Sequence, residues 1–142
     1  MGYLADHHRN MRGDLDRNPS RRFSMKELWL PYPPSVNHAF RNLPGGGRAK
    51  ASHYRAWRKE AALELMAQRP PKYKGQYTLE ISARRPDNRM RDIDNLIKPI
   101  SDALVAAGIV RDDSDCVKVT AEWSDKAQRV GCMIRVEPWV LL

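Results

Sequence analysis

Three aspartates between residues 92 and 113 have the residue type and the spacing of a metal site. Asp92 and Asp94 are two positions apart, and Asp113 follows beyond one predicted helix. Side chains at positions i and i+2 of an extended chain point to the same side, so Asp92 and Asp94 converge if their segment ends a strand. Carboxylates, water and substrate phosphate are the ligands that Mg²⁺ usually takes in proteins. The pair therefore predicts a metal site to which Asp113 could contribute a third carboxylate.

The helix expected between these acids decides whether Asp113 can reach the other two. Apolar residues recur at helical spacing across 95–107, and we expect a helix there with Asp94 or Asn95 as its N-cap. Such a helix is about 20 Å long, and the extended segment 108–113 spans about the same distance. The spacing therefore permits a site built within one chain, although a partner subunit could complete it instead.

Basic residues surround the predicted site. Lys98 follows Asp94 by one helical turn, where its ammonium group could offset charge developing on a phosphoryl group. The segment before Asp92 carries Arg84, Arg85, Arg89 and Arg91. Acids that hold a hard cation, set among basic side chains, suggest metal-assisted hydrolysis of a phosphodiester, in which the ion activates water and steadies the leaving oxygen.

Each of these features also has a purely structural interpretation. The Asp92-x-Asp94 pair could be a solvated turn that ends in an N-cap, and Asp94 with Lys98 could be an exposed ion pair of little energetic weight. The acidic segment 111–115 could be a polar loop leading into a strand, and Asp102 at mid-helix is expected to face outward rather than to bind an ion. The joint pattern, rather than any single residue, favours a catalytic site.

The joint pattern resembles a known family. The segment RRPDNRMRDIDNLIKPISDALVAAGIVRDD is similar to the central signature of the RusA family of Holliday junction resolvases, and LPYPPSVNHAFRN resembles its N-terminal proline-rich motif. The resemblance runs from about Leu28 to the end of the chain. It implies a Mg²⁺-dependent endodeoxyribonuclease, with Mn²⁺ as an alternative ion, that resolves four-way DNA junctions by paired symmetric nicks in recombination and repair.

The resemblance also implies residue roles and a quaternary structure. The family's catalytic, metal-binding aspartates fall on Asp92, Asp94 and Asp113, and its essential lysine falls on Lys98. Whether Asp112 shares the role of Asp113, and whether one or two ions bind, stay open at this point. A homodimer is implied, and a two-fold dimer would present two equivalent sites to a four-way junction.

The charge of the chain supports a nucleic-acid substrate. It carries 25 Lys and Arg against 17 Asp and Glu, a formal net charge of +8, and such a surface concentrates polyanions. The residues expected to contact DNA are Arg41, Arg48, Lys50, Arg84, Arg85, Arg89, Arg91 and Asn95. No apolar run is long enough to span a membrane and no signal peptide is recognisable, so we expect a cytoplasmic protein with both cysteines reduced.

Hydrophobic periodicity predicts one α+β domain over residues 25–142. Residues 1–24 are polar without apolar periodicity, which predicts a flexible tail or a segment upstream of an alternative start at Met25. A long irregular loop is expected over 31–50, and a hairpin loop over 124–129. The predicted order is β-α-β-α-β-β, a mainly antiparallel or mixed sheet with both helices on one side. The predicted strands are 26–30, 77–83, 117–123 and 130–136, and the other helix starts at Ser52 and carries a core-facing stripe of Tyr54, Trp57, Ala61 and Leu65.

Two other functions stay open on the residues alone. A nuclease of broader structure selectivity would act on flaps, forks and other branched DNA. A catalytically silent protein would bind junctions without cutting them. The intact set of Asp92, Asp94, Lys98 and Asp113 favours an enzyme over the silent protein.

Overall fold

The computed structural model describes residues 27–35, 40–42, 44, 48–50, 52–125 and 129–140, with side chains for all of these except 40–42 and 48–50. The predicted tail, residues 1–24, lies outside the described residues, so its separation from a 25–142 domain stays a prediction. None of the described helices is long and apolar enough to cross a bilayer.

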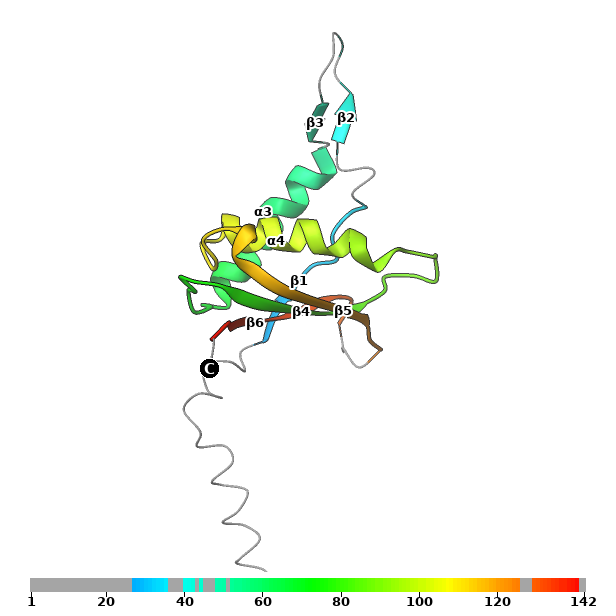
Figure 1. Cartoon of the computed structure of the whole chain (residues 1–142). Coiled ribbons are helices and arrows are strands. Elements are labelled where there is room, and N and C mark those ends of the chain that lie inside the picture. The colour runs from blue at the N-terminus through cyan, green and yellow to red at the C-terminus, as the bar shows by residue number, and fades with distance from the viewer. Residues whose placement is uncertain are drawn as a thin grey trace, which may run out of the picture.

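A four-stranded mixed sheet forms one layer of the molecule (Figure 1). Its strand order is β1 (Glu27–Leu30), β6 (Gly131–Pro138), β4 (Tyr77–Arg84) and β5 (Cys116–Trp123). β6 runs antiparallel to both β1 and β4, whereas β4 and β5 are parallel. Parallel neighbours need a crossover connection, and helix α4 (Ile97–Ala106) lies in the connection between them.

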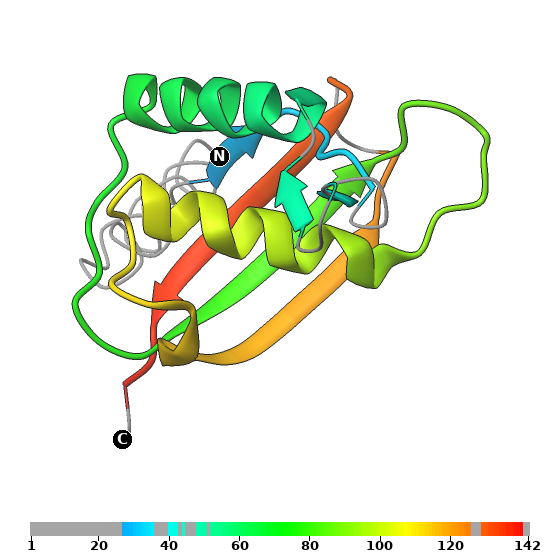
Figure 2. The same ribbon diagram turned by 90° about the horizontal axis from the view of Figure 1, so that it is seen from above.

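Two α-helices cover one face of this sheet. Figure 2 shows α3 (Ser52–Ala67) and α4 side by side on the same side of the strands. This arrangement confirms the predicted α+β class with both helices on one face of a mixed sheet. The opposite face of the sheet carries the alternate, polar side chains of its strands.

The core forms where the strand and helix periodicities predicted it. Alternate residues of β4, from Tyr77 through Ala83, are at most 1 % exposed. They pack in one cluster with α4 and with the stripe on α3. The stripe on α3 is buried, which confirms core packing over base stacking; it consists of Tyr54, Trp57, Ala61 and Leu65.

The predicted hairpin between the last two strands is wrong. β5 and β6 are not neighbours, because β4 lies between them and pairs with both. The apolar alternation on β5 also predicted a buried face, yet Val117 is 41 % and Val119 39 % exposed. The physical reason is position: β5 is at the edge of the sheet, where one flank and much of its helix-side face have no covering element. Both cysteines are free, as predicted, with Cys132 buried and Cys116 half-buried.

The expected irregular loop over 31–50 contains a second, small sheet. β2 (Phe40–Asn42) pairs antiparallel with β3 (Arg48–Lys50), with Arg41 opposite Ala49. Figure 1 shows these two strands near the start of α3, away from the main sheet. Short paired strands around a Pro- and Gly-rich turn have too few residues for alternation to reveal them. The predicted DNA contacts Arg41, Arg48 and Lys50 lie on these strands, and their side chains are outside the described part of the chain.

Replacement of Gly131 should strongly destabilise the fold. Gly131 begins β6 with a φ of +139°, and a Cβ there would lie 2.5 Å from the Leu30 carbonyl oxygen and 2.5 Å from Trp29 Nε1. We expect Gly131→Ala to lower the free energy of unfolding by about 1–3 kcal/mol, measured by urea denaturation. Gly75→Ala is the matched control, because nothing lies within 4 Å of its Cβ position; an equal loss in both variants would contradict this account.

Replacement of Tyr77 by phenylalanine should not weaken the fold. The Tyr77 side chain is fully buried, its hydroxyl has no hydrogen-bond partner among the described residues, and burial raises its pKa to about 12. Since an unpaired buried hydroxyl costs about 1–3 kcal/mol, Tyr77→Phe should leave the free energy of unfolding unchanged or raise it at neutral pH.

The same variant should alter the alkaline limb of the stability curve. Because the unfolded tyrosine ionises first, stability falls as the pH rises from about 10 toward 12. The free energy of unfolding of Tyr77→Phe should fall less steeply than that of the wild type over that pH range, measured by denaturant titrations. A steeper fall, or a large loss at neutral pH, would show that the hydroxyl has a stabilising partner.

Candidate active site

The segment that follows β4 places Asp92 and Asp94 on a short turn rather than at the start of an α-helix. Asp92 is extended, with φ −84° and ψ 126°, and the 3₁₀ turn η2 (Ile93–Leu96) comes directly after it. α4 itself begins only at Ile97. The predicted helix start at residue 95 and the predicted N-cap at Asp94 or Asn95 are therefore wrong.

Backbone hydrogen bonds explain why these acids do not act as caps. The Asn95 N–H donates to the Asp92 carbonyl oxygen at 3.2 Å, and the Ile97 N–H donates to that of Asp94. These two N–H groups are thus bonded to backbone carbonyls, and no side chain caps the turn. Both carboxylates are exposed and have no hydrogen bond or ion pair to any residue that the structure describes. They are available to an external ligand.

The third predicted acid lies beside Lys98. Lys98 Nζ, on the first turn of α4, donates to Asp113 Oδ2 at 3.0 Å and pairs with Asp102 Oδ1 at 3.0 Å. Asp113 reaches it from η3 (Asp113–Asp115), the turn that precedes β5. The hydrogen bonds that Lys98 donates, to Asp102 first and to Asp113 second, raise the pKa of Lys98 above its ordinary value. The lysine is therefore a fixed cation between two carboxylates.

Asp112 and Asp113 have different environments. Asp112 is the N-cap of η3, and its Oδ1 accepts a hydrogen bond from the Ser114 N–H at 2.8 Å. That bond lowers the pKa of the Asp112 carboxyl. A capping side chain fixes the turn, whereas the Asp113 side chain points to Lys98. The geometry thus separates a turn-forming acid from one that faces the chemistry.

Asp87 orders the arginine-rich loop before Asp92. Its Oδ2 lies 2.8 Å from Arg91 Nη2, and its Oδ1 accepts the Arg89 N–H at 3.0 Å. The Arg91 hydrogen bond is the main reason that the pKa of Asp87 is lowered. The Arg91 guanidinium also lies 5.3 Å from the centre of the Tyr32 ring. Arg91 is thus held in place, while the side chain of Arg89 is largely exposed.

Two separate hollows are lined by several of the predicted residues, whereas Asp94 lines neither of them. The first, about 250 Å³, includes Asp92, Asn95 and Arg91 in its lining. The second, about 410 Å³, includes Lys98, Asp113 and Asp102, together with Arg58, Val105, Ala106 and Asp112. Among the described residues, no three His, Cys, Asp or Glu side chains are grouped to hold a metal ion. Within one chain, the structure keeps Asp92 and Asp113 in different hollows.

The donor chemistry nevertheless suits Mg²⁺. This ion keeps several waters and is usually bound through one or two carboxylates plus substrate phosphates, rather than by an all-protein cage. Asp92 and Asp94 offer two exposed carboxylates without partners among the described residues, two positions apart in the chain. A site of this kind is completed by the substrate, so a prearranged group of three acids is not required.

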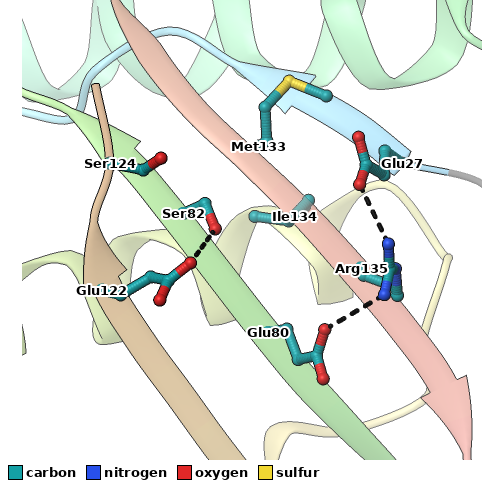
Figure 3. A pocket seen from close by; sticks show the side chains of 8 residues that line it. All are labelled: Glu27, Glu80, Ser82, Glu122, Ser124, Met133, Ile134 and Arg135. Atoms are coloured by element: carbon teal, nitrogen blue, oxygen red, sulfur yellow. Dashed lines mark hydrogen bonds and ion pairs between the residues drawn. The ribbon is translucent and has the colours of Figure 1, made fainter. Parts of the chain in front are cut away.

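A further hollow of about 360 Å³ lies on the open face of the sheet, opposite the helices (Figure 3). Arg135 there lies 3.0 Å from Glu27 and 3.5 Å from Glu80, and Ser82 donates to Glu122 at 3.0 Å. Its three carboxylates outnumber the one guanidinium, so the hollow keeps a net negative charge. None of the predicted site residues lines it.

Comparison with known proteins identifies the family. The family model described as "Endodeoxyribonuclease RusA" matches residues 31–137, which include every predicted catalytic residue. The chain belongs to the RusA family. The predicted resemblance is thereby confirmed, and the mixed four-stranded sheet with two helices is consistent with a RusA-like fold.

Several individual RusA proteins are similar to this chain. RusA of Escherichia coli K12 is 35 % identical over 96 residues, which are 63 % of this chain and 75 % of that protein. RusA of Enterobacteria phage HK97 is 32 % identical over 113 residues, 74 % of this chain and 89 % of its own. RusA of Aquifex aeolicus is 29 % identical over 116 residues, covering 78 % and 86 %. All three are named crossover junction endodeoxyribonucleases.

Two residues around the candidate site were not singled out from the sequence, and the contact of a third was not foreseen. Asp102, which was expected to face outward rather than to bind an ion, pairs with Lys98; its spacing of four residues from Lys98 is the signal that could have revealed this pair. Arg58 of α3 lines the hollow with Lys98, and Tyr32 lines the hollow with Asp92. These two come from distant parts of the chain, so only the tertiary structure reveals them.

Lys98 should matter little for the stability of this RusA protein. Its two ion pairs are at the surface, where exposed pairs contribute about 0–1 kcal/mol each. We expect Lys98→Met to change the free energy of unfolding by no more than about 1 kcal/mol, with the change shrinking at high salt. Urea denaturation at low and high salt measures this, with Asp102→Asn as the variant that breaks one pair alone. A large loss would show that Lys98 supports the fold.

Proposed function

We propose that this RusA protein is a metal-dependent endodeoxyribonuclease that resolves four-way (Holliday) DNA junctions by paired symmetric nicks in recombination and repair. The observation that carries the proposal is the pair of exposed, unpartnered carboxylates of Asp92 and Asp94, one turn before the Lys98–Asp113 ion pair. The family match and the names of the relatives support the same reaction.

The residues of the chain have distinct roles in this reaction. Asp92 and Asp94 would hold Mg²⁺, or Mn²⁺ in its place, together with the scissile phosphate. When bound, the ion supplies an activated water and polarises the phosphorus centre. Lys98, held cationic by its two carboxylate neighbours, stabilises the charge that develops on the phosphoryl oxygens. Asp113 would orient Lys98 and is proposed as the third metal ligand, although within one chain it lines a different hollow from Asp92.

Basic side chains of the same face bind the DNA backbone. Arg85, Arg89 and Arg91 are on the loop that leads to Asp92, and Arg84 ends β4. With the three basic residues of the β2–β3 strands, these four arginines would provide phosphate contacts that make binding strongly dependent on salt. Asn95, on η2, is uncharged and is proposed as a DNA contact of another kind. Arg89, with its largely exposed guanidinium, is the loop residue best placed to meet a phosphate.

The active form is proposed to be a homodimer with two-fold symmetry. A four-way junction has approximate two-fold symmetry, and two nicks at equivalent positions are needed to give two duplexes. A two-fold dimer presents two copies of the same site in the matching relation. The dimer would also bring additional carboxylates near each site without any change in the chain.

Neutral replacements of the acids should stop cleavage but not binding. We expect Asp92→Asn, Asp94→Asn and Asp113→Asn each to lower the nicking rate by at least roughly a hundredfold, the scale for losing one group that stabilises transition-state charge. Junction affinity should stay within a few-fold, because basic residues dominate backbone binding. The measurements are Mg²⁺-dependent nicking of a synthetic four-way junction and gel-shift titration. Glu80→Gln, on the open face of the sheet, is the matched control and should nick normally.

The same assay separates the proposed function from its alternatives. Equal cleavage of junctions, forks and flaps would replace the resolvase by a nuclease of broader structure selectivity. If the unmodified protein binds junctions but never nicks them with Mg²⁺ or Mn²⁺, the nuclease proposal is wrong. Persistent nicking in the presence of a chelator would overturn the metal dependence alone.

A further inference from the structure

We propose that the hollow beside Asp92 binds one unstacked nucleobase of the DNA strand next to the scissile phosphate. This inference rests on the proposed function and specifies how the site would recognise its substrate. The hollow has a volume of about 250 Å³ and lies between the segment after β1 and the start of η2. The lining residues that matter here are Tyr32, Pro33, Pro34, Arg91, Asp92 and Asn95.

The walls of the hollow have the chemistry of a base-stacking site. Tyr32 contributes a half-buried aromatic ring, and Pro33, Pro34 and Leu96 contribute apolar surface. The Arg91 guanidinium lies 5.3 Å from the Tyr32 ring centre, and Asp87 holds it there through a 2.8 Å ion pair. Unstacked bases pack on aromatic rings and on guanidinium planes. The guanidinium lies over one face of the Tyr32 ring, so a base would stack on the other face of the ring or on the outer plane of the guanidinium.

Asn95 supplies the polar group that such a pocket needs. Its backbone N–H is used by the turn, whereas its half-buried side-chain amide has no hydrogen-bond partner in the part of the chain that the structure describes. An amide offers both a donor and an acceptor, and this pattern matches the edge of a base. Apolar walls with one or two oriented polar groups are typical of ligand pockets.

The position of Asp92 favours a base over an anion. Asp92 lines the same hollow, so a phosphate deep inside it, without a metal ion to bridge the two groups, would meet an unpartnered carboxylate. A neutral, planar ring meets no such repulsion. A phosphodiester held at Asp92 has its neighbouring base within reach of the hollow, and bases at the branch point of a junction are less well stacked and cost less to extrude. The ligand class is therefore a nucleobase of the cleaved strand.

Abasic substitution tests this pocket directly. The full-length Asp113→Asn protein, whose substitution is in the other hollow, is titrated with four-way junctions that carry one abasic nucleotide at successive positions around the cut. We expect one position at which loss of the base weakens binding by roughly five- to hundredfold, the range for a base stacked on an aromatic side chain. In Tyr32→Leu this position dependence should disappear. Trp139→Leu, an exposed aromatic outside the hollow, is the matched control and should keep it.

A second variant keeps the test decisive if Tyr32→Leu folds poorly. Asn95→Ala, in the otherwise unmodified protein, is compared with the wild type on junctions that carry each of the four bases at the identified position. The junction affinity of the wild type should differ by roughly five- to hundredfold between the best and the worst base. The affinity of the variant should differ by less than about twofold. The folding of each variant is checked by denaturation before the comparison.

The outcomes separate this inference from the proposed function. If the wild type nicks junctions but no abasic position affects binding and Asn95→Ala keeps its base preference, the pocket proposal is overturned and the nuclease stands. If the wild type binds without nicking, the proposed function falls, while the abasic profile still decides the pocket. If it does not bind junctions at all, both are overturned.

Discussion

The parallel pairing of β4 with β5 is the constraint on which the arrangement of the site depends. Its register places Cys116, at the start of β5, beside Tyr77, at the start of β4. Asp92 follows the other end of β4, so α4 must carry the chain back along the sheet before Asp113 enters η3. The acids thus belong to opposite ends of one crossover, which explains why one chain holds them in two hollows. Lys98 contacts Asp113 from the first turn of α4.

The acids along this crossover fall into two groups, those that bond to other groups of the chain and those that do not. Asp87 neutralises Arg91 and orders the loop, and Asp112 caps η3, so both of these acids act on the chain itself. Asp102 and Asp113 both pair with Lys98, whereas Asp92 and Asp94 lack partners within the described residues. In a chain with a net charge of +8, two unpaired carboxylates attract a divalent cation while the basic surroundings attract its phosphate ligand. The substrate and the ion therefore complete each other's site.

Local sequence patterns predicted the elements whose structure depends on the residues within them. Alternation identified β4 because one face of this strand is buried in the core and the other is not. Helical spacing identified the buried stripe on α3. The same reasoning failed where tertiary context decides. Alternation cannot name a strand's neighbour, so β5 was paired with the wrong strand, and its valines are exposed because β5 is at the sheet edge. The turn η2 was missed because backbone bonds, not the expected Asp94 or Asn95 cap, start the helix.

The missed turn has a functional consequence. An N-cap must give its side-chain oxygen to the helix, and an acid engaged in this way is a poorer metal ligand. By closing η2 with backbone bonds, the chain leaves the Asp92 and Asp94 carboxylates free and keeps Asn95 at the wall of the adjacent hollow. One residue of this segment thus handles the phosphate while its near neighbour faces the base. Chemistry and recognition are therefore fixed in register by the same short turn, so a shift of the bound strand by one nucleotide would misplace both together.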